Sequence, residues 1–354
     1  MSRLDKFFFG LLVFIPITAT ASFFGVSPLF IFPLSALAIV PLAKFIGEAT
    51  EQLAVRVGPA IGGLLNASFG NATELIIGAL AIKSGLIEVV KASLTGSIIG
   101  NLLLVTGMAM LFGGWKHKKQ KFNRTAAMAK GSSLFVVMVA LVMPAIFFAA
   151  TQRGGILALE DLSIFAAVGL ILLYLANLWF SLRTHRHLYM EKVGAEELKS
   201  DGWSKKQSIS ILFLATLFVS WMSDIMVGTI EPLVARLGWS DIFVGVIFVA
   251  IIGNVAEHVS AITMAVKKRM DLALSVAIGS AEQIAMFVAP FLVLVSILAP
   301  TPMNLLFNSL ELISLVLAVV LINLIIADGE SNWLEGLQLL VAYCVIAVAF
   351  FLHP

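Results

Sequence analysis

The chain has 354 residues, of which 60% are hydrophobic and only 12% charged, with a formal net charge of +2 and a mean hydropathy of +1.02. A soluble domain averages about half apolar and about a quarter charged residues, so this composition excludes a water-soluble globular protein and requires a lipid environment. The single cysteine, Cys344, excludes an internal disulfide and any site built from several thiolates.

Eleven apolar stretches are long enough to cross a membrane, because a hydrocarbon core about 30 Å thick needs roughly 20 residues of helix. The N-terminal stretch follows Arg3 and Lys6 and also resembles a signal peptide, but its length favours a retained helix. In chain order the spans are predicted at residues 7–24, 28–46, 54–82, 85–113, 125–150, 158–183, 207–235, 240–266, 271–298, 302–326 and 333–352.

Lysine and arginine divide unequally between the two sides of the membrane that these spans define. Of 23 such residues, 19 fall on the side of the N-terminus, with clusters at 116–124 and 267–269. Cytoplasmic loops carry this kind of excess, so the N-terminus is predicted to be cytoplasmic and the C-terminus outside. The longest polar segment, 184–206, is expected to be a cytoplasmic linker between two halves of the chain.

A short motif recurs across that linker. The sequence GNATE beginning at Gly70 matches GNVAE beginning at Gly253, at an offset of 183 residues. At the same offset, Gly96-Ser97 matches Gly279-Ser280. Five spans separate the copies, and because five is odd the halves enter the membrane in opposite directions, as in inverted-repeat transporters. The predicted fold is an all-α polytopic membrane protein with an extra N-terminal helix (1–27), a five-helix repeat (28–183), the linker (184–206) and a second, inverted five-helix repeat (207–354).

Each copy of the motif places a glutamate within an apolar span, Glu74 in the third and Glu257 in the eighth. A carboxylate near the bilayer centre costs several kcal/mol unless it is paired or hydrated, so it indicates a functional site. A structural polar contact between helices would explain one such residue. Two at equivalent repeat positions favour a site.

The residues before each glutamate can supply further ligands. Asn71 and Asn254 stand three positions earlier and share the helix face of the carboxylate. The adjoining Gly70 and Gly253 make the helix easy to interrupt, which frees backbone carbonyls for coordination. Oxygen ligands of this kind suit Ca²⁺, which takes roughly 6–8 of them, and no histidine or cysteine cluster indicates a softer metal.

Two further spans carry polar side chains that we expect to line the same site. Ser97 and Asn101 are four residues apart in the fourth span, and Ser280 and Gln283 are three apart in the ninth, so each pair shares a helix face. Small neighbours such as Gly96 let these helices approach closely, which is the alternative reason for the composition.

The two glutamates also account for coupling to protons. Desolvation favours the neutral carboxyl, whereas a bound cation favours the ionised form. Protons and Ca²⁺ would then exclude one another from one site, which is the minimum that an exchanger requires. The expected partners are therefore Ca²⁺ and H⁺ as transported substrates and the lipid bilayer, with no catalytic residue, cofactor or nucleic acid; a homo-oligomer is left open.

The motifs resemble those of a known family. GNATEL (70–75) and GNVAEH (253–258) are similar to the two signature repeats of the Ca²⁺/H⁺ antiporter (CAX) family of the cation/Ca²⁺ exchanger superfamily, and GSAEQIAMFVAP (279–290) is similar to its GS-x-x-QIA-x-x-x-x-P segment. The resemblance covers essentially the whole chain and implies alternating access, in which peripheral helices slide past a fixed core. It implies a cation and proton site made of Glu74, Glu257, Asn71, Asn254, Ser280 and Gln283.

Several acidic or basic side chains have two interpretations. His258 follows Glu257 in the resembling motif but points about 100° away on a helix, so it is either a partner behind the ligands or a helix contact. Glu282 departs from the family pattern and is either a third carboxylate of the cation pathway or a structural group. Vestibule groups or ordinary polar contacts are expected at Glu88, Asp224, Glu231 and Glu311.

Other functions remain as alternatives. A Na⁺/Ca²⁺ exchanger of the same superfamily is the nearest, although the Glu-His pair and Gln283 favour the proton version. An intramembrane enzyme is disfavoured because the chain has no H-E-x-x-H motif, aspartate pair or serine nucleophile with a histidine base. A cation channel often uses identical subunits, whereas this chain carries its own inverted pair. The long cytosolic N-terminal extension of eukaryotic members is absent, which favours the cell membrane of a bacterium or archaeon.

Overall fold

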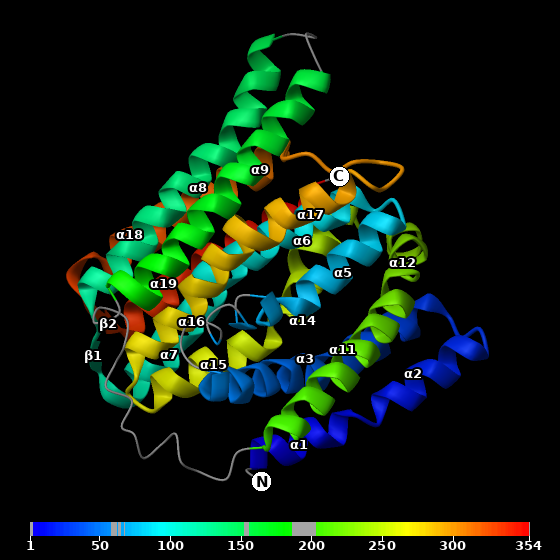
Figure 1. Ribbon diagram of the computed structural model, residues 1–354, viewed down its shortest axis with the longest axis horizontal. Coiled ribbons are helices and arrows are strands. Elements are labelled where there is room, and N and C mark those ends of the chain that lie inside the picture. The colour runs from blue at the N-terminus through cyan, green and yellow to red at the C-terminus, as the bar shows by residue number, and fades with distance from the viewer. Residues whose placement is uncertain are drawn as a thin grey trace.

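Helices make up nearly all of the regular structure, as expected for a chain that must satisfy its backbone hydrogen bonds inside a bilayer (Figure 1). The computed structural model describes residues 3–57, 62, 65–66, 68–151, 156–185 and 203–353. Part of the predicted third span (54–82) and residues 186–202 of the predicted linker lie outside this description.

The helices divide between the two halves of the chain. The first contains α1 (Arg3–Leu11), α2 (Phe14–Phe23), α3 (Pro28–Val57), α5 (Ala72–Lys83), α6 (Ile87–Ile99), η1 (Gly100–Val105), α7 (Thr106–His117), β1 (Lys119–Lys121), α8 (Arg124–Thr151), α9 (Ile156–Trp179) and η2 (Phe180–Thr184). The second contains α11 (Lys205–Val227), α12 (Ile230–Leu237), α13 (Asp241–Phe243), η4 (Val244–Val249), α14 (Ala250–Gly253), α15 (Val255–Val266), α16 (Met270–Gln283), η5 (Ile284–Val288), α17 (Ala289–Ser296), α18 (Ser309–Ile325), η6 (Ile326–Asp328), β2 (Glu330–Asn332) and α19 (Trp333–Leu352).

In the described residues, nine helices are long and apolar enough to cross a membrane, or ten if the bent pair Asp241–Gly253 and Val255–Val266 forms one span. The predicted all-helical polytopic fold is confirmed. The prediction of eleven spans differs from this count at 54–82, whose described helix α5 has only 12 residues. The second predicted span, 28–46, was too short, because α3 continues to Val57. The tenth starts later than predicted, at Ser309, because the Asn308 side chain caps that helix.

The two halves repeat each other in detail. Helices α5 and α15 both have 12 residues, and each bound of α15 lies 183 residues after the matching bound of α5. The residue before each helix is an asparagine outside helical geometry, with φ −111° at Asn71 and φ −101° at Asn254. Helices α6 and α16 both run into a π-helical turn, η1 and η5. The interruptions expected from the Gly-Asn pairs are therefore present in both copies.

Helices from the two halves pack against each other in corresponding pairs. The helices that open the two predicted repeats, α3 and α11, lie side by side, and α8 packs on α18 (Figure 1). Helix α19 packs on α7, while its counterpart α9 packs on α17. Helices α5, α6, α14, α15 and α16 gather between these pairs, so the two Gly-Asn breaks meet in the interior of the molecule.

Contacts between loops agree with the predicted alternation of sides. Strands β1 and β2 pair antiparallel, with Lys119 opposite Asn332, and both lie in loops predicted to be cytoplasmic. On the other predicted side, Arg236 Nη1 donates a hydrogen bond to Ser27 Oγ at 3.1 Å. In Figure 1 the N-terminal end lies at the bottom of the molecule and the C-terminal end lies in its upper half.

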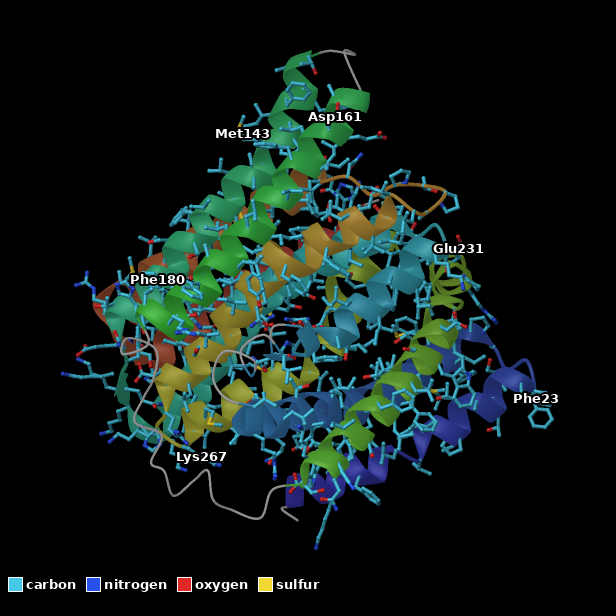
Figure 2. The ribbon with its side chains drawn as sticks, viewed as in Figure 1. Phe23, Met143, Asp161, Phe180, Glu231 and Lys267 are labelled. Carbon is cyan, nitrogen blue, oxygen red and sulfur yellow. The ribbon has the colours of Figure 1, made fainter. Side chains whose placement is uncertain are left out.

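The outer surface of the helices is apolar. Phe23, Leu172 and Val345 are more than half exposed, as side chains facing lipid would be. Figure 2 shows charged side chains at both ends of the molecule, with Asp161 and Glu231 at the end away from Lys267. This arrangement is the one expected of a protein surrounded by a bilayer.

Candidate cation-binding site

Six of the predicted site residues form one hydrogen-bonded network that joins the two halves of the chain. Across the halves, Asn71 Nδ2 donates to Gln283 Oε1 at 2.7 Å, and Asn254 Nδ2 donates to Ser97 Oγ at 2.8 Å. Asn101 Nδ2 donates to Asn254 Oδ1 at 2.9 Å. All of these amides are buried or partly buried, and each hydrogen bond fixes the direction of a side chain in the interior.

Ser280 completes the network. Its hydroxyl accepts a hydrogen bond from Asn101 Nδ2 at 3.1 Å and lies 3.5 Å from both Asn71 Oδ1 and Asn254 Oδ1. The Ser280–Asn71 contact is the repeat counterpart of the Ser97–Asn254 contact, with the roles of the halves exchanged. The two pairs predicted to share a helix face, Ser97 with Asn101 and Ser280 with Gln283, therefore each contact an asparagine of the opposite half.

The helix breaks that precede the two glutamates let the asparagines reach this network. Asn71 and Asn254 leave helical geometry, and α5 and α15 begin at the next residue. In the adjoining helix, η1 lacks the usual hydrogen-bond pattern, and Thr106 Oγ1 donates to the carbonyl of Asn101 at 2.9 Å. Such π-helical turns are frequent at functional sites because they redirect side chains without ending the helix.

The two glutamates carry oxygens that have no hydrogen-bond partner in the structure. Both carboxylate oxygens of Glu74 are buried and unpartnered, as are Glu257 Oε2 and Asn101 Oδ1. The carboxyl groups of Glu74 and Glu257 are close enough to interact electrostatically. Buried polar atoms are almost always satisfied, so a cluster of oxygens of this kind indicates a place for a cation or a proton.

Gly253 allows Glu74 to occupy this position. A Cβ atom on Gly253 would lie 3.1 Å from Glu74 Cγ and 3.4 Å from Glu74 Oε1, so the carboxylate of the first half lies against the backbone of the second. Gly70 is placed similarly, with a Cβ position 3.7 Å from Gln283 Oε1. The two glycines predicted at the site are therefore neighbours of its side chains.

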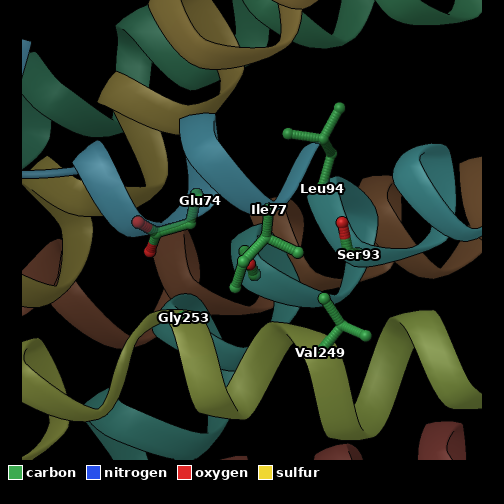
Figure 3. Close-up of a pocket in the computed structure, with 7 residues that line it drawn as sticks. Glu74, Ile77, Ser93, Leu94, Val249 and Gly253 are labelled. Atoms are coloured by element: carbon green, nitrogen blue, oxygen red, sulfur yellow. The ribbon is translucent and has the colours of Figure 1, made fainter. Parts of the chain in front are cut away.

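A narrow pocket lies beside Glu74 (Figure 3). Its free volume of about 10 Å³ is roughly the room that one water-sized occupant needs. Ser93 contributes to it and was not among the predicted site residues, although it lies one turn before Ser97 on the same helix. The pocket is lined by Glu74, Ile77, Ser93, Leu94, Ser97, Val249 and Gly253.

The structure places His258 and Glu282 apart from the network. His258 is buried; its backbone N–H donates to the carbonyl of Asn254 at 3.1 Å, while its side chain makes no hydrogen bond to the site residues in the described part of the chain. Glu282 is 5% exposed and accepts a hydrogen bond from Asn177 Nδ2 of α9 at 3.5 Å. The ammonium group of Lys130 of α8 is near enough to act on it electrostatically without forming an ion pair. Asn177 and Lys130 come from distant spans, so the sequence alone gave no reason to link them with Glu282.

The donor set determines what the site can hold. No group of three or more histidine, cysteine, aspartate or glutamate residues is gathered in the described residues. The carboxylate, amide and hydroxyl oxygens from both halves instead form an all-oxygen surrounding, as a hard cation such as Ca²⁺ prefers. The same carboxylates can take up protons when no cation is bound.

Comparison with known proteins identifies the family of this chain. The family described as sodium/calcium exchanger protein matches residues 27–183 and 207–352, which nearly coincide with the two predicted repeats. A Ca²⁺/H⁺ antiporter of Synechocystis sp. is 45% identical over 369 residues, covering 100% of this chain and 99% of the relative. The Ca²⁺/H⁺ antiporter ChaA of Bacillus subtilis is 46% identical over 341 residues, covering 96% of each chain.

Solved structures agree in fold. Native YfkE superimposes with a TM-score of 0.86 at 42% identity, covering 98% of this chain and 100% of that one. The H⁺/Ca²⁺ exchanger CAX gives a TM-score of 0.73 over 99% of this chain and 92% of that one, and at 15% identity it supports the fold alone. The predicted resemblance is confirmed, and the chain is a transporter rather than an enzyme. It belongs to the sodium/calcium exchanger protein family.

Proposed function

We propose that this chain is a secondary transporter that exchanges Ca²⁺ for H⁺ across the membrane by alternating access. The observation that carries the proposal is the set of buried, unpartnered oxygens on Glu74 and Glu257, contributed by equivalent positions of the two halves. Relatives named as Ca²⁺/H⁺ antiporters match the chain over nearly its whole length. One chain contains both carboxylates and is a complete exchanger in this proposal.

The exchange follows from competition for the same carboxylates. Ca²⁺ binds the ionised forms of Glu74 and Glu257, and the oxygens of Asn71, Asn254 and Ser97 surround it. When Ca²⁺ leaves, two negative charges remain in a buried site, and protons neutralise them. A conformation with an empty, doubly charged site is too costly to change sides, so the return step carries protons.

The arrangement in the membrane is proposed to be one extra helix followed by two inverted five-helix repeats. The matched bounds of α5 and α15 and the paired packing of corresponding helices support this plan. The excess of lysine and arginine favours a cytoplasmic N-terminus and an outside C-terminus. The bacterial relatives, at 45% and 46% identity, support the cell membrane of a bacterium as the location.

The test is flux of ⁴⁵Ca²⁺ in proteoliposomes that contain the purified chain. In sodium-free buffer with the membrane potential clamped, we expect an imposed pH gradient to drive Ca²⁺ flux. Flux that ignores the pH gradient and appears only with a Na⁺ gradient would contradict the proposal and support Na⁺/Ca²⁺ exchange. Flux without either gradient, at channel rates, would contradict both.

A further inference from the structure

Glu282 lies in a second polar cluster that the proposed exchange does not use. Its carboxyl group is buried against α8 and α9, where Asn177 Nδ2 donates a hydrogen bond to Glu282 Oε1 at 3.5 Å and Ser133 lies nearby. The equivalent residue of the first half, 183 positions earlier, is Ile99, which is fully buried and apolar. A carboxylate at this place therefore breaks the repeat and needs its own explanation.

Lys130 of α8 brings a positive charge to the same helix surface. Its Nζ donates hydrogen bonds to the carbonyl oxygen and to Oγ of Ser275, both at 3.0 Å. Ser275, Gly279 and Glu282 are spaced four and three residues apart, so they form one stripe along α16. A Cβ on Gly279 would lie 3.0 Å from Lys130 Nζ, which shows that the ammonium group sits over this glycine.

Lys130 and Glu282 form no direct ion pair, but both charged groups lie along the same stripe of α16. We propose that they compensate each other's charge across this surface and that both are positioning residues for the cation site. The pair connects α8 and α9 to α16. Ser280 and Gln283 project from another face of the same helix into the central network, where Gln283 accepts a hydrogen bond from Asn71 at 2.7 Å. Helix α16 thus carries the site on one face and the charge pair on another.

The nearby ammonium group argues against Glu282 as a ligand in the cation pathway. A divalent cation bound at Glu282 would be repelled by the positive charge of Lys130. In a low-dielectric interior, removing one partner leaves the other charge uncompensated and is strongly unfavourable, whereas removing both partners together is often nearly neutral. A double-mutant cycle can therefore separate a charge pair from a transport ligand.

The experiment compares Lys130→Gln, Glu282→Gln and the double variant. We expect each single variant to lower the maximal Ca²⁺ transport rate by about tenfold, as displaced site residues commonly do, and to lower the thermal unfolding temperature in detergent. The double variant is expected to recover most of both losses. The transport readout rests on the proposed function, whereas the unfolding temperature does not, so failure of exchange and failure of the pair are distinguishable.

Two outcomes would overturn the inference. One is a double variant whose losses equal the combined losses of the single variants in both readouts. The other is a Lys130→Gln variant that binds Ca²⁺ more tightly while Glu282→Gln binds it more weakly, which would make Glu282 a pathway carboxylate. If a single variant does not fold, recovery of folded protein in the double variant supports the pair, and continued misfolding contradicts it.

A third substitution displaces the ammonium group and keeps both charges. Gly279→Ala is expected to lower the transport rate less than Lys130→Gln does, and to have no further effect in the Lys130→Gln background. Gly169→Ala in α9 is the matched control, since nothing lies within 4 Å of a Cβ at that position. A Gly279→Ala effect that is unchanged without Lys130 would contradict the contact on which the pair depends.

Discussion

In the proposed exchange, Glu74 and Glu257 must be able to carry a negative charge and to bind a proton, and a side chain of the same shape without these properties cannot replace them. Their buried oxygens have no partner, and the surrounding amides are already engaged with one another. Glutamine would keep the volume and a hydrogen-bonding oxygen, but it could neither carry a charge nor release a proton. Each half contributes one of these glutamates, so we expect that neither glutamate can compensate for the loss of the other.

Glu74→Gln or Glu257→Gln alone is therefore expected to reduce gradient-driven Ca²⁺ flux to background while the protein stays folded in the membrane. The measurement is ⁴⁵Ca²⁺ flux in proteoliposomes, with size-exclusion profiles to establish folding. Glu231→Gln is the control, because that glutamate is exposed on α12. Substantial flux through either folded glutamate variant would remove that residue from the mechanism.

At this scale the repeated motif predicted most of the site. Glu74, Glu257 and the two asparagines were recognisable because polar groups in apolar spans are costly and recur at one offset. The surroundings of Glu282 were not predictable. Its partners Lys130 and Asn177 lie on other spans, and sequence spacing describes only neighbours on one helix.

At the scale of helices, glycines determine where the two halves can touch. A Cβ on Gly96 would lie 2.1 Å from the carbonyl oxygen of Val246, so α6 and η4 are in backbone contact there. Gly100, one turn later, has nothing within 4 Å of its Cβ position. Close helix approach thus explains Gly96 but not Gly100, although both are small residues in the same span.

Gly96→Ala is expected to lower the free energy of unfolding by at least about 1–3 kcal/mol, because the facing atoms are backbone and cannot rotate away. Thermal unfolding in detergent measures the loss. Gly100→Ala serves as the matched control and should unfold close to the original temperature. Equal unfolding temperatures for the two variants would mean that the α6–η4 contact is looser than described.

Helix bounds were predictable wherever hydropathy changes sharply, as at α8 and α19. They were not predictable for α3, where the apolar run ends but the helix continues through Glu48 and Glu51 to Val57. Water outside the bilayer permits a helix to extend beyond the hydrocarbon, and hydropathy does not record this. The π-helical turns were also not predicted, because no residue type or spacing distinguishes them from α-helix in a sequence.

For the whole molecule, the predicted sides of the membrane can be tested by labelling. In a Cys344→Ala background, single cysteines at Lys118 and Lys267 are expected to react with a membrane-impermeant reagent only from the cytoplasmic side. A cysteine at Thr301 is expected to react only from outside. All three positions are exposed. The reverse pattern would invert the proposed orientation, and a mixed pattern would mean that a span was miscounted.

The pH dependence of Ca²⁺ binding tests coupling in the whole transporter. Acid favours neutral carboxyl groups, which are poor ligands, and bound Ca²⁺ must expel their protons. Apparent Ca²⁺ affinity is therefore expected to fall as pH falls, by about tenfold per pH unit for each proton displaced. Equilibrium ⁴⁵Ca²⁺ binding in sodium-free detergent solution measures the slope, with Glu231→Gln as a control. An apparent Ca²⁺ affinity that does not change with pH would mean that Ca²⁺ and protons do not compete for the same carboxylates.

The alternation of sides stays a prediction, which rests on the mutual constraint between charge asymmetry and span count. The meeting of β1 with β2 could not be foreseen, since three-residue strands leave almost no pattern in a sequence. Which helices of the two halves pair was likewise outside the sequence, because lipid-facing and protein-facing apolar residues look alike.

The breaks at Asn71 and Asn254 also set the electrostatics of release. Each begins a 12-residue helix whose first turn contains the site glutamate. A helix N-terminus carries a partial positive charge of roughly half a unit, so two macrodipoles direct their positive ends at the proposed cation site. They stabilise the two carboxylates and at the same time weaken their hold on a divalent ion. A transporter must release its ion in every cycle. The two helix N-termini keep the two carboxylates from binding a divalent cation too tightly for release.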